Sequence, residues 1–222
     1  MNKWFNLDSP IMQGLSRLTD LVFLSVLWFA CCLPVVTIGA STTAMYYVAM
    51  KMVREDTEKK LTVMFFEAFK SNFKQATVMN IIFLAVGAVL ATDCFIMLST
   101  TGDAVTLSFA VFLVMLIWML CIMFYAYPLQ AQFYNTIKRT LLNAAILSMR
   151  KFPVTAVVFA LNMLPVLLAF VPTYGLTLVI RMAPVWVLLM PGLAAYLNSK
   201  FFVKMFDPYL KREDEESSEE TE

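Results

Sequence analysis

The chain has 222 residues, of which 60% are hydrophobic and 15% charged, with a formal net charge of +1 and a mean hydropathy of +0.74. A soluble domain has about 45–50% apolar and about 25% charged residues, so this composition excludes an ordinary soluble domain and predicts a membrane protein with several spans. The sequence contains no histidine, which removes the commonest proton shuttle and transition-metal ligand.

The sequence has none of the motifs that mark an enzyme or a cofactor site. It contains no phosphate-binding glycine loop, no nucleophile elbow and no cluster of metal ligands. The four cysteines lie in apolar runs without metal-ligand spacing and are typical of packing residues: Cys31, Cys32, Cys94 and Cys121. We therefore expect a protein that is not an enzyme, that uses no cofactor or metal, and that contacts a lipid bilayer rather than nucleic acid.

The first two apolar segments are expected to form a helical hairpin over residues 20–52. Its first helix must begin near Gly14, because about 20 residues are needed to span a bilayer. Pro34 breaks the apolar run, since proline lacks a backbone N–H. The turn after it is small and rich in hydroxyl groups, a composition that lets helices approach closely and hydrogen-bond across their contact: Thr37, Gly39, Ser41 and Thr42. Two interpretations stay open, a tight hairpin at the outer face or a segment that lines a ligand site.

Four further spans are predicted at 76–99, 105–127, 154–171 and 176–196, the last two kinked by prolines. Two amphipathic helices, at 61–75 and 138–151, are expected to lie on the membrane surface. The prediction is therefore an all-α transmembrane bundle over residues 1–210, with about six spans arranged as three hairpins. Residues 211–222 are strongly acidic and are expected to be a disordered tail, serving either solubility or docking to a basic partner surface.

The orientation follows from the basic residues near the ends of the spans. Lysine and arginine gather at 51–74, 138–151 and 200–212, all on one predicted side of the bilayer. The opposite loops, around Thr37, Gly102 and Thr173, contain none. Because cytoplasmic loops carry the excess of lysine and arginine, we expect a protein of the cytoplasmic membrane with both termini and both amphipathic helices in the cytoplasm.

Three polar residues within the predicted spans are candidates for a functional cluster, because charged groups at such depth are costly: Asp93, Asn162 and Arg181. Asp93 and Arg181 are expected at similar depths below the outer surface. An ion pair between them, snorkelling of each side chain to the interface and a solute site are the open alternatives. For Asn162 and Arg181, repair of the helix kinks at Pro165 and Pro184 is the plainer explanation.

The N-terminal third resembles a known family. The segments that carry the resemblance are Leu18-Thr19-Asp20-Leu21, Cys32-Leu33-Pro34-Val35-Val36-Thr37-Ile38-Gly39-Ala40-Ser41-Thr42-Thr43-Ala44 and Phe65-Phe66-Glu67-Ala68-Phe69-Lys70. They are similar to the signature of the YesL-like family of bacterial membrane proteins, strongly over residues 4–75 and loosely as far as Phe206. Ser25 departs from the family pattern, which has asparagine there, and this weakens a polar role for the position.

The resemblance implies a multi-span membrane protein that is often encoded beside ABC-type carbohydrate importers. We therefore expect a non-enzymatic accessory or assembly partner of such an importer, docking to its permease or ATPase subunit. The candidate docking surface comprises apolar residues of the two amphipathic helices: Phe65, Phe66, Phe69, Phe73, Leu142 and Ile146. The alternative is an independent small-solute transporter or channel that uses the proline-broken fifth and sixth helices.

Overall fold

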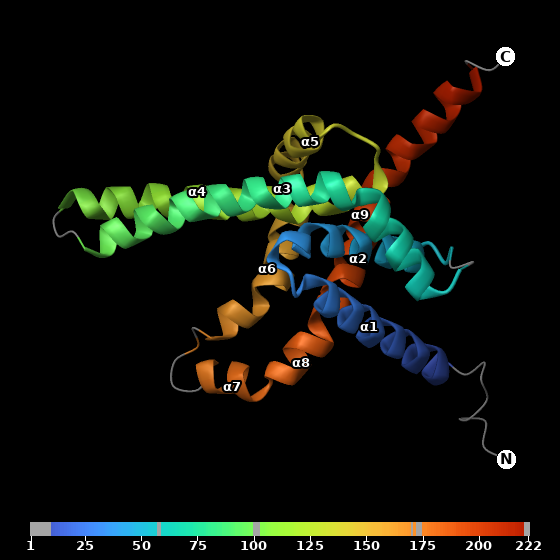
Figure 1. Cartoon of the computed structure of the whole chain (residues 1–222), viewed down its shortest axis with the longest axis horizontal. Helices are drawn as coiled ribbons and strands as arrows, with labels where there is room; N and C mark the ends of the chain where they lie inside the picture. Colours follow the sequence, from blue (N-terminus) through green and yellow to red (C-terminus); the bar gives the residue numbers. More distant parts are fainter. Residues whose placement is uncertain (1–9, 57–58, 100–102, 170, 172–174, 220–222) are drawn as a thin grey trace. The chain divides into compact units, whose positions relative to one another are not determined.

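The computed structural model describes residues 10–56, 59–99, 103–169, 171 and 175–219. The predicted loops around Gly102 and Thr173 and the last three residues of the acidic tail lie outside the described residues. All described regular elements are helical (Figure 1), which confirms the all-α prediction. In chain order they are α1 (Pro10–Cys32), the 3-10 turn η2 (Val35–Thr37), α2 (Ile38–Val53), α3 (Leu61–Leu98), α4 (Asp103–Gln132), α5 (Ile137–Arg150), α6 (Phe152–Ala169), α7 (Gly175–Arg181), α8 (Ala183–Leu188) and α9 (Met190–Glu219).

Four of the described helices are long and apolar enough to cross a membrane. The candidate spans are Met12–Cys32, Leu61–Met97, Ser108–Gln132 and Phe152–Ala169. The predicted count of six therefore stays a prediction. Helix α2 has 16 residues and is about 24 Å long, short of the roughly 30 Å of a hydrocarbon core. The predicted sixth span is divided among α7, α8 and the start of α9.

Proline and glycine positions explain where the structure departs from the predicted boundaries. The amphipathic helix predicted at 61–75 and the span predicted at 76–99 form one helix of 38 residues, α3, because no proline or glycine interrupts residues 61–86. Pro184 and Pro191 lie in the first turns of α8 and α9, where a missing N–H costs nothing. They therefore divide the predicted sixth span instead of kinking it, whereas Pro165 stays inside α6.

The chain forms two compact units, which we describe separately. The first unit comprises residues 1–30, 45–66 and 161–222, and the second comprises residues 31–44 and 67–160. The prediction of one transmembrane domain over 1–210 stays a prediction, as does disorder of the acidic tail, whose residues continue α9 to Glu219.

The core of the first unit is built from aromatic and large apolar side chains of α1, α2 and α9. Phe202 stacks on Phe206 with ring centroids 5.6 Å apart, and the Tyr46 ring meets Phe202 edge-on at 5.9 Å. All three rings are buried, as are Leu24 and Met50. Burial of large apolar and aromatic side chains is the main favourable contribution to packing of this kind.

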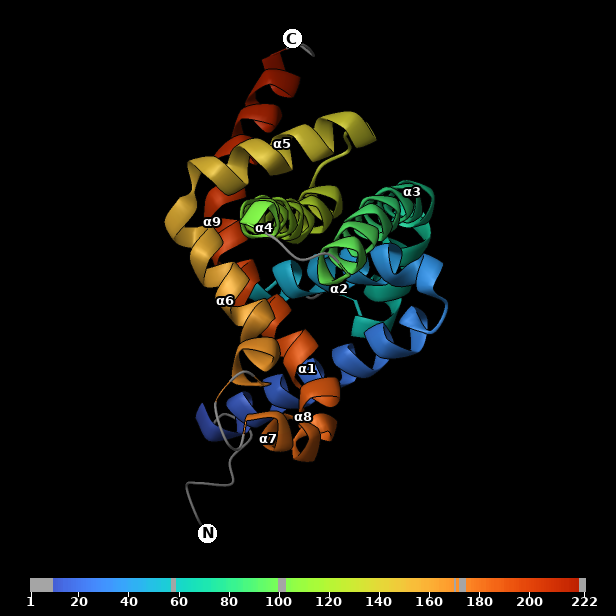
Figure 2. The same cartoon turned by 90° about the vertical axis from the view of Figure 1, so that its left-hand side faces the viewer.

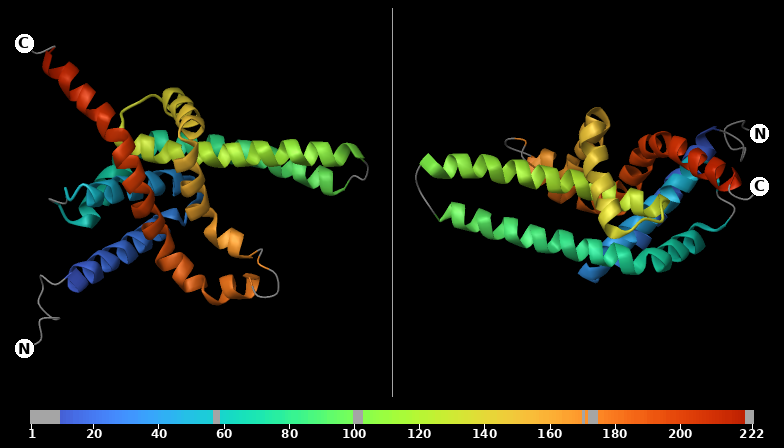
Figure 3. Two further views of the ribbon diagram at one scale, coloured as in Figure 1. Left: turned by 180° about the vertical axis from the view of Figure 1, so that it is seen from behind. Right: turned by 90° about the horizontal axis from the view of Figure 1, so that it is seen from above.

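The second unit contains a long antiparallel pair, formed by residues 67–98 of α3 and by α4, which run side by side (Figure 3). Helix α5 crosses α4 (Figure 2). The first part of α6 also packs on α4, because the Tyr125 and Thr155 hydroxyls hydrogen-bond at 2.9 Å and the Phe124 and Phe159 rings meet at 6.1 Å. Thr155 also donates to the Ser148 carbonyl at 2.7 Å and so fixes the junction between α5 and α6.

Candidate functional site

The three polar residues predicted as an intramembrane cluster lie in different environments. Asp93 is exposed on α3 in the second unit, and Arg181 is exposed at the end of α7 in the first. The ion pair between them stays a prediction. Asn162 is half-buried on α6, and its side chain hydrogen-bonds the Tyr46 hydroxyl. This contact with α2 was not predicted, and it joins Asn162 to a buried polar group rather than only to the backbone near Pro165.

Tyr46 is the centre of a buried polar group in the first unit. The Asn198 side-chain amide donates to the Tyr46 hydroxyl at 3.2 Å. Asn198 and Ser199 are completely buried, and the Asn198 Oδ1 and Ser199 Oγ atoms have no hydrogen-bond partner within the described part of the chain. Unpaired buried polar atoms lower the free energy of unfolding. This region of α9 therefore destabilises a core that otherwise consists of aromatic and apolar side chains.

Helices α1 and α9 meet at a close crossing built on Gly192. A Cβ atom at Gly192 would lie 2.4 Å from the Leu21 carbonyl oxygen and 2.7 Å from the Ser25 Oγ. The Ser25 hydroxyl accepts a hydrogen bond from the Gly192 N–H at 2.9 Å and donates one to the Leu21 carbonyl at 2.9 Å. Ser25 therefore caps a free N–H in the first turn of α9. The prediction that serine weakens a polar role here was wrong, because a short hydroxyl suits the narrow gap.

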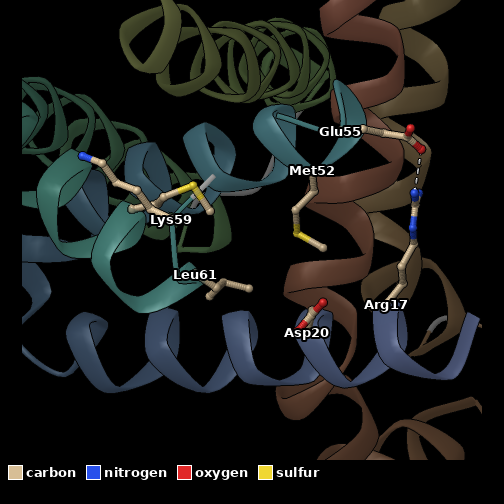
Figure 4. Close-up of a pocket in the computed structure, with 7 residues that line it drawn as sticks. Arg17, Asp20, Met52, Glu55, Lys59 and Leu61 are labelled. Atoms are coloured by element: carbon tan, nitrogen blue, oxygen red, sulfur yellow. Dashed lines mark hydrogen bonds and ion pairs between the residues drawn. The ribbon is translucent and has the colours of Figure 1, made fainter. Parts of the chain in front are cut away.

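The first unit contains a cavity of about 430 Å³ between α1, α2 and the start of α3, lined by Arg17, Asp20, Met52, Glu55, Lys59, Leu61 and Met64 (Figure 4). Arg17 donates to the Glu55 carboxylate and to the Tyr196 hydroxyl, each at 2.8 Å. Asp20 points from α1 towards Met52. The cavity thus combines two cations, two carboxylates and an apolar wall, and its volume lies within the range of small-ligand sites.

Glu55 has an unusual backbone conformation that fixes its carboxylate at this cavity. Its φ is 59°, in the left-handed region. The Asp56 N–H bonds the Lys51 carbonyl at 3.1 Å and the Glu55 N–H bonds the Met52 carbonyl at 3.3 Å. These two bonds form a Schellman motif at the end of α2, in which glycine normally occupies the position of Glu55. A side chain there costs about 1–2 kcal/mol, so the carboxylate is retained at a conformational cost.

The hairpin turn of the second unit uses its hydroxyl groups locally. The Thr37 hydroxyl donates to the carbonyls of Cys31 and Pro34, at 2.6 and 2.7 Å, and so bridges the break at Pro34. Ser41 and Thr42 donate to carbonyls four residues earlier on α2. Each of these hydrogen bonds stays within the turn or within α2 and does not cross to another helix. The geometry favours a tight hairpin over a segment that lines a ligand site.

In the second unit, α2 and α3 cross closely at Gly39. A Cβ at Gly39 would lie 2.4 Å from the Ala76 carbonyl oxygen on α3. Beside it, the Asn80 amide donates to the Val35 carbonyl at 2.9 Å and accepts from the Tyr127 hydroxyl at 3.2 Å. Asn80 is 5% exposed, so a single buried amide ties the hairpin turn, α3 and α4 together.

A second buried amide extends this polar contact along α4. Gln130 hydrogen-bonds Asn72 at 3.3 Å and also Gln75, both on α3. Its oxygen accepts from the Thr140 hydroxyl of α5 at 3.4 Å. Gln130 is 4% exposed. The two amides therefore hold together the end of the α3–α4 pair at which α5 packs.

Comparison with known proteins finds a family match in the N-terminal part of the chain. Residues 21–94 match the model of a family described as "Protein of unknown function, DUF624". No curated protein and no solved structure shows significant similarity to the chain. The matched segment contains both close-crossing partners Ser25 and Gly39, the Glu55 turn and Asn80. The finer family name and its link to carbohydrate import go beyond this match.

The predicted docking surface is only partly exposed. Phe66 and Phe73 are 50% and 39% exposed, and Phe69 is half-buried. Phe65 is completely buried and does not belong to the surface, because neighbouring positions on a helix point about 100° apart and Phe65 faces the core with Ala68. On α5, which follows the matched segment, Leu142 and Ile146 are 57% and 49% exposed.

Proposed function

We propose that this chain is a non-enzymatic integral membrane protein that serves as an accessory or assembly partner of an ABC-type carbohydrate importer. It resides in the cytoplasmic membrane with both termini in the cytoplasm and docks through α5 to a permease or ATPase subunit. The docking role is supported by the surface of α5, and the choice of partner by the resemblance of the N-terminal signature.

The supporting observation is that α5 exposes its large apolar side chains and buries small ones, the reverse of a surface helix in a soluble protein. Its buried stripe consists of small side chains, two of which carry hydroxyl groups: Thr140, Ala144 and Ser148. Its exposed stripe is apolar and repeats at helical spacing: Leu142, Ile146 and Met149. In water such an arrangement leaves apolar surface exposed, so the outer face must meet lipid or a partner. Four exposed basic residues flank it, at Lys138, Arg139, Arg150 and Lys151, and an amphipathic partner segment with acidic edges matches this pattern.

The alternative function, transport through proline-broken helices, receives less support from the first unit. Asn162, which the transport hypothesis needs along a solute path, is joined to Tyr46. Tyr46 is itself buried among the rings of α9. A packed aromatic core at this point favours a structural role for Asn162 over a solute path.

Photocrosslinking in native membranes tests the docking role. A photoreactive phenylalanine analogue at Leu142 is expected to capture a permease or ATPase subunit of a sugar importer. The matched control is the same analogue at Val114, which is 67% exposed on α4 and is expected to capture lipid. Lipid alone from both positions, or one identical set of proteins from both, would contradict the proposal.

A charge substitution on the same face tests whether α5 carries the affinity. Leu142→Glu would place a carboxylate in the apolar contact and is expected to lower copurification of the importer subunit about tenfold or more. Tyr134→Glu is the control, because Tyr134 is 99% exposed in the connection before α5. An equal loss in both variants would assign the effect to charge in general and not to the α5 face.

A further inference from the structure

We propose that the cavity between α1, α2 and α3 binds the phosphoethanolamine headgroup of a membrane phospholipid. This site is separate from the partner-docking face of α5 and does not depend on the function proposed above. It is built from four charged and three apolar residues: Arg17, Asp20, Glu55 and Lys59, with Met52, Leu61 and Met64.

The charges of the lining match a zwitterion. Arg17 provides a cationic donor for a phosphate, in the planar geometry that suits phosphate oxygens. The Lys59 side chain lines the far side of the cavity and its ammonium points away from Arg17 (Figure 4). Asp20 and Glu55 provide carboxylates for a primary ammonium. Glu55 already pairs with Arg17, so an anionic phosphoglycerol headgroup would leave the Asp20 carboxylate next to a negative charge without a cation, and a choline group has no N–H to donate to it. A group that carries both a phosphate and a primary amine can pair with the Arg17 guanidinium and the Asp20 carboxylate together, beside the Glu55 carboxylate that holds Arg17.

The position of the cavity fits a lipid rather than a free solute. Arg17 and Asp20 lie in the first half of the candidate span Met12–Cys32, where charged side chains reach headgroups. Apolar side chains along the same helix are exposed for contact with acyl chains: Leu15, Leu18 and Phe23 are 56%, 42% and 44% exposed. Polar recognition of the headgroup and apolar contact with its chains are therefore available on one helix.

Two observations indicate that the charged groups are held in place before a ligand arrives. The Arg17 guanidinium is held by the Tyr196 hydroxyl of α9 and the Glu55 carboxylate, as Figure 4 shows for Glu55. Glu55 occupies the turn position that normally requires glycine. Strained backbone at a cavity wall is a feature of binding sites, and here it keeps a carboxylate where glycine would provide none.

Lipid retention provides the test. The full chain is extracted into nanodiscs that contain equal amounts of phosphatidylethanolamine, phosphatidylglycerol and phosphatidylcholine, and retained lipid is identified by native mass spectrometry. Phosphatidylethanolamine is expected to be retained about tenfold over either other lipid. Asp20→Asn is expected to remove that preference, because one charge-assisted hydrogen bond accounts for a change of about this size. Glu67→Gln, an exposed acid on α3 outside the cavity, is expected to keep it.

Glu55→Gly separates the site from folding, because glycine suits the turn and the variant is expected to melt no lower than the parent in lipid-free detergent. It is nevertheless expected to lose the preference for phosphatidylethanolamine. Equal retention of all three lipids by the parent, a preference for phosphatidylglycerol, or an unchanged preference in both Asp20→Asn and Glu55→Gly would overturn the proposal. Melting temperature in detergent is also compared with soluble phosphoethanolamine and with a short-chain phosphatidylethanolamine. An equal rise with both would overturn the assignment to a lipid.

Discussion

Two close helix crossings, one in each compact unit, are built in the same way, with a glycine against a backbone carbonyl of the neighbouring helix. In the second unit Gly39 lets α2 approach the Ala76 carbonyl, and in the first unit Gly192 lets α9 approach the Leu21 carbonyl. In both cases a Cβ would lie 2.4 Å from a carbonyl oxygen. A buried polar side chain then ties the crossing to a backbone group, Asn80 to Val35 in one and Ser25 to Gly192 in the other.

The crossings differ in how far apart their partners lie in the sequence. Asn80 and Val35 are 45 residues apart and both belong to the matched segment 21–94. Ser25 and Gly192 are 167 residues apart, and Gly192 lies outside that segment. The first crossing is therefore a feature of the N-terminal signature alone, whereas the second joins the signature to the C-terminal helix of the chain.

Adding one methyl group at each glycine is expected to give the largest effect. Gly39→Ala and Gly192→Ala should each lower the free energy of unfolding by about 2–3 kcal/mol, because the new Cβ meets backbone that cannot give way. Gly87→Ala is the matched control, since a Cβ there meets nothing within 4 Å, and it should raise stability by about 0.5–1 kcal/mol. Unfolding in mixed detergent micelles measures all three, and equal behaviour of Gly39→Ala and Gly87→Ala would disprove the close approach.

Removing the polar tie at each crossing is expected to have a smaller effect. Ser25→Ala leaves the Gly192 N–H without its acceptor, and Asn80→Ala leaves the Val35 carbonyl without its donor. Each should lower the free energy of unfolding by about 1–2 kcal/mol. Thr92→Val is the control, because the Thr92 hydroxyl bonds the Ala88 carbonyl on an exposed face. A loss for Thr92→Val as large as that for Ser25→Ala would mean that burial of the tie is irrelevant.

The smallest expected effect comes from one hydroxyl. Tyr127→Phe removes the 3.2 Å bond to Asn80 while the ring stays packed edge-on against Phe83 at 6.0 Å. The expected loss of unfolding free energy is about 1 kcal/mol. In the Asn80→Ala background the same substitution should have almost no effect, since the acceptor is already absent. A full additional loss in the double variant would show that Tyr127 and Asn80 act independently.

The sequence predicted the helical class, the break at Pro34 and the small-residue turn, because composition, proline chemistry and helical spacing are local signals. It did not predict that α3 would run unbroken from Leu61, or that the segment after Gly175 would divide at its prolines. The Ser25 cap, the Asn162–Tyr46 bond and the cavity around Arg17 were also missed. Each of these joins residues far apart in the chain, and no spacing in a single sequence reports such a contact. The positive φ of Glu55 had no local signal, because glycine, asparagine and aspartate are the residues that favour this conformation.

Crossing of the bilayer by the α3–α4 pair is tested most directly by a topology reporter. A phosphatase that is active only outside the cytoplasm is fused after Gly102, between the two helices, and separately after Arg150, at the end of α5. Activity after Gly102 together with inactivity after Arg150 is the predicted result, because basic residues flank α5 and none occurs near Gly102. Activity in both fusions, or inactivity after Gly102, would contradict it.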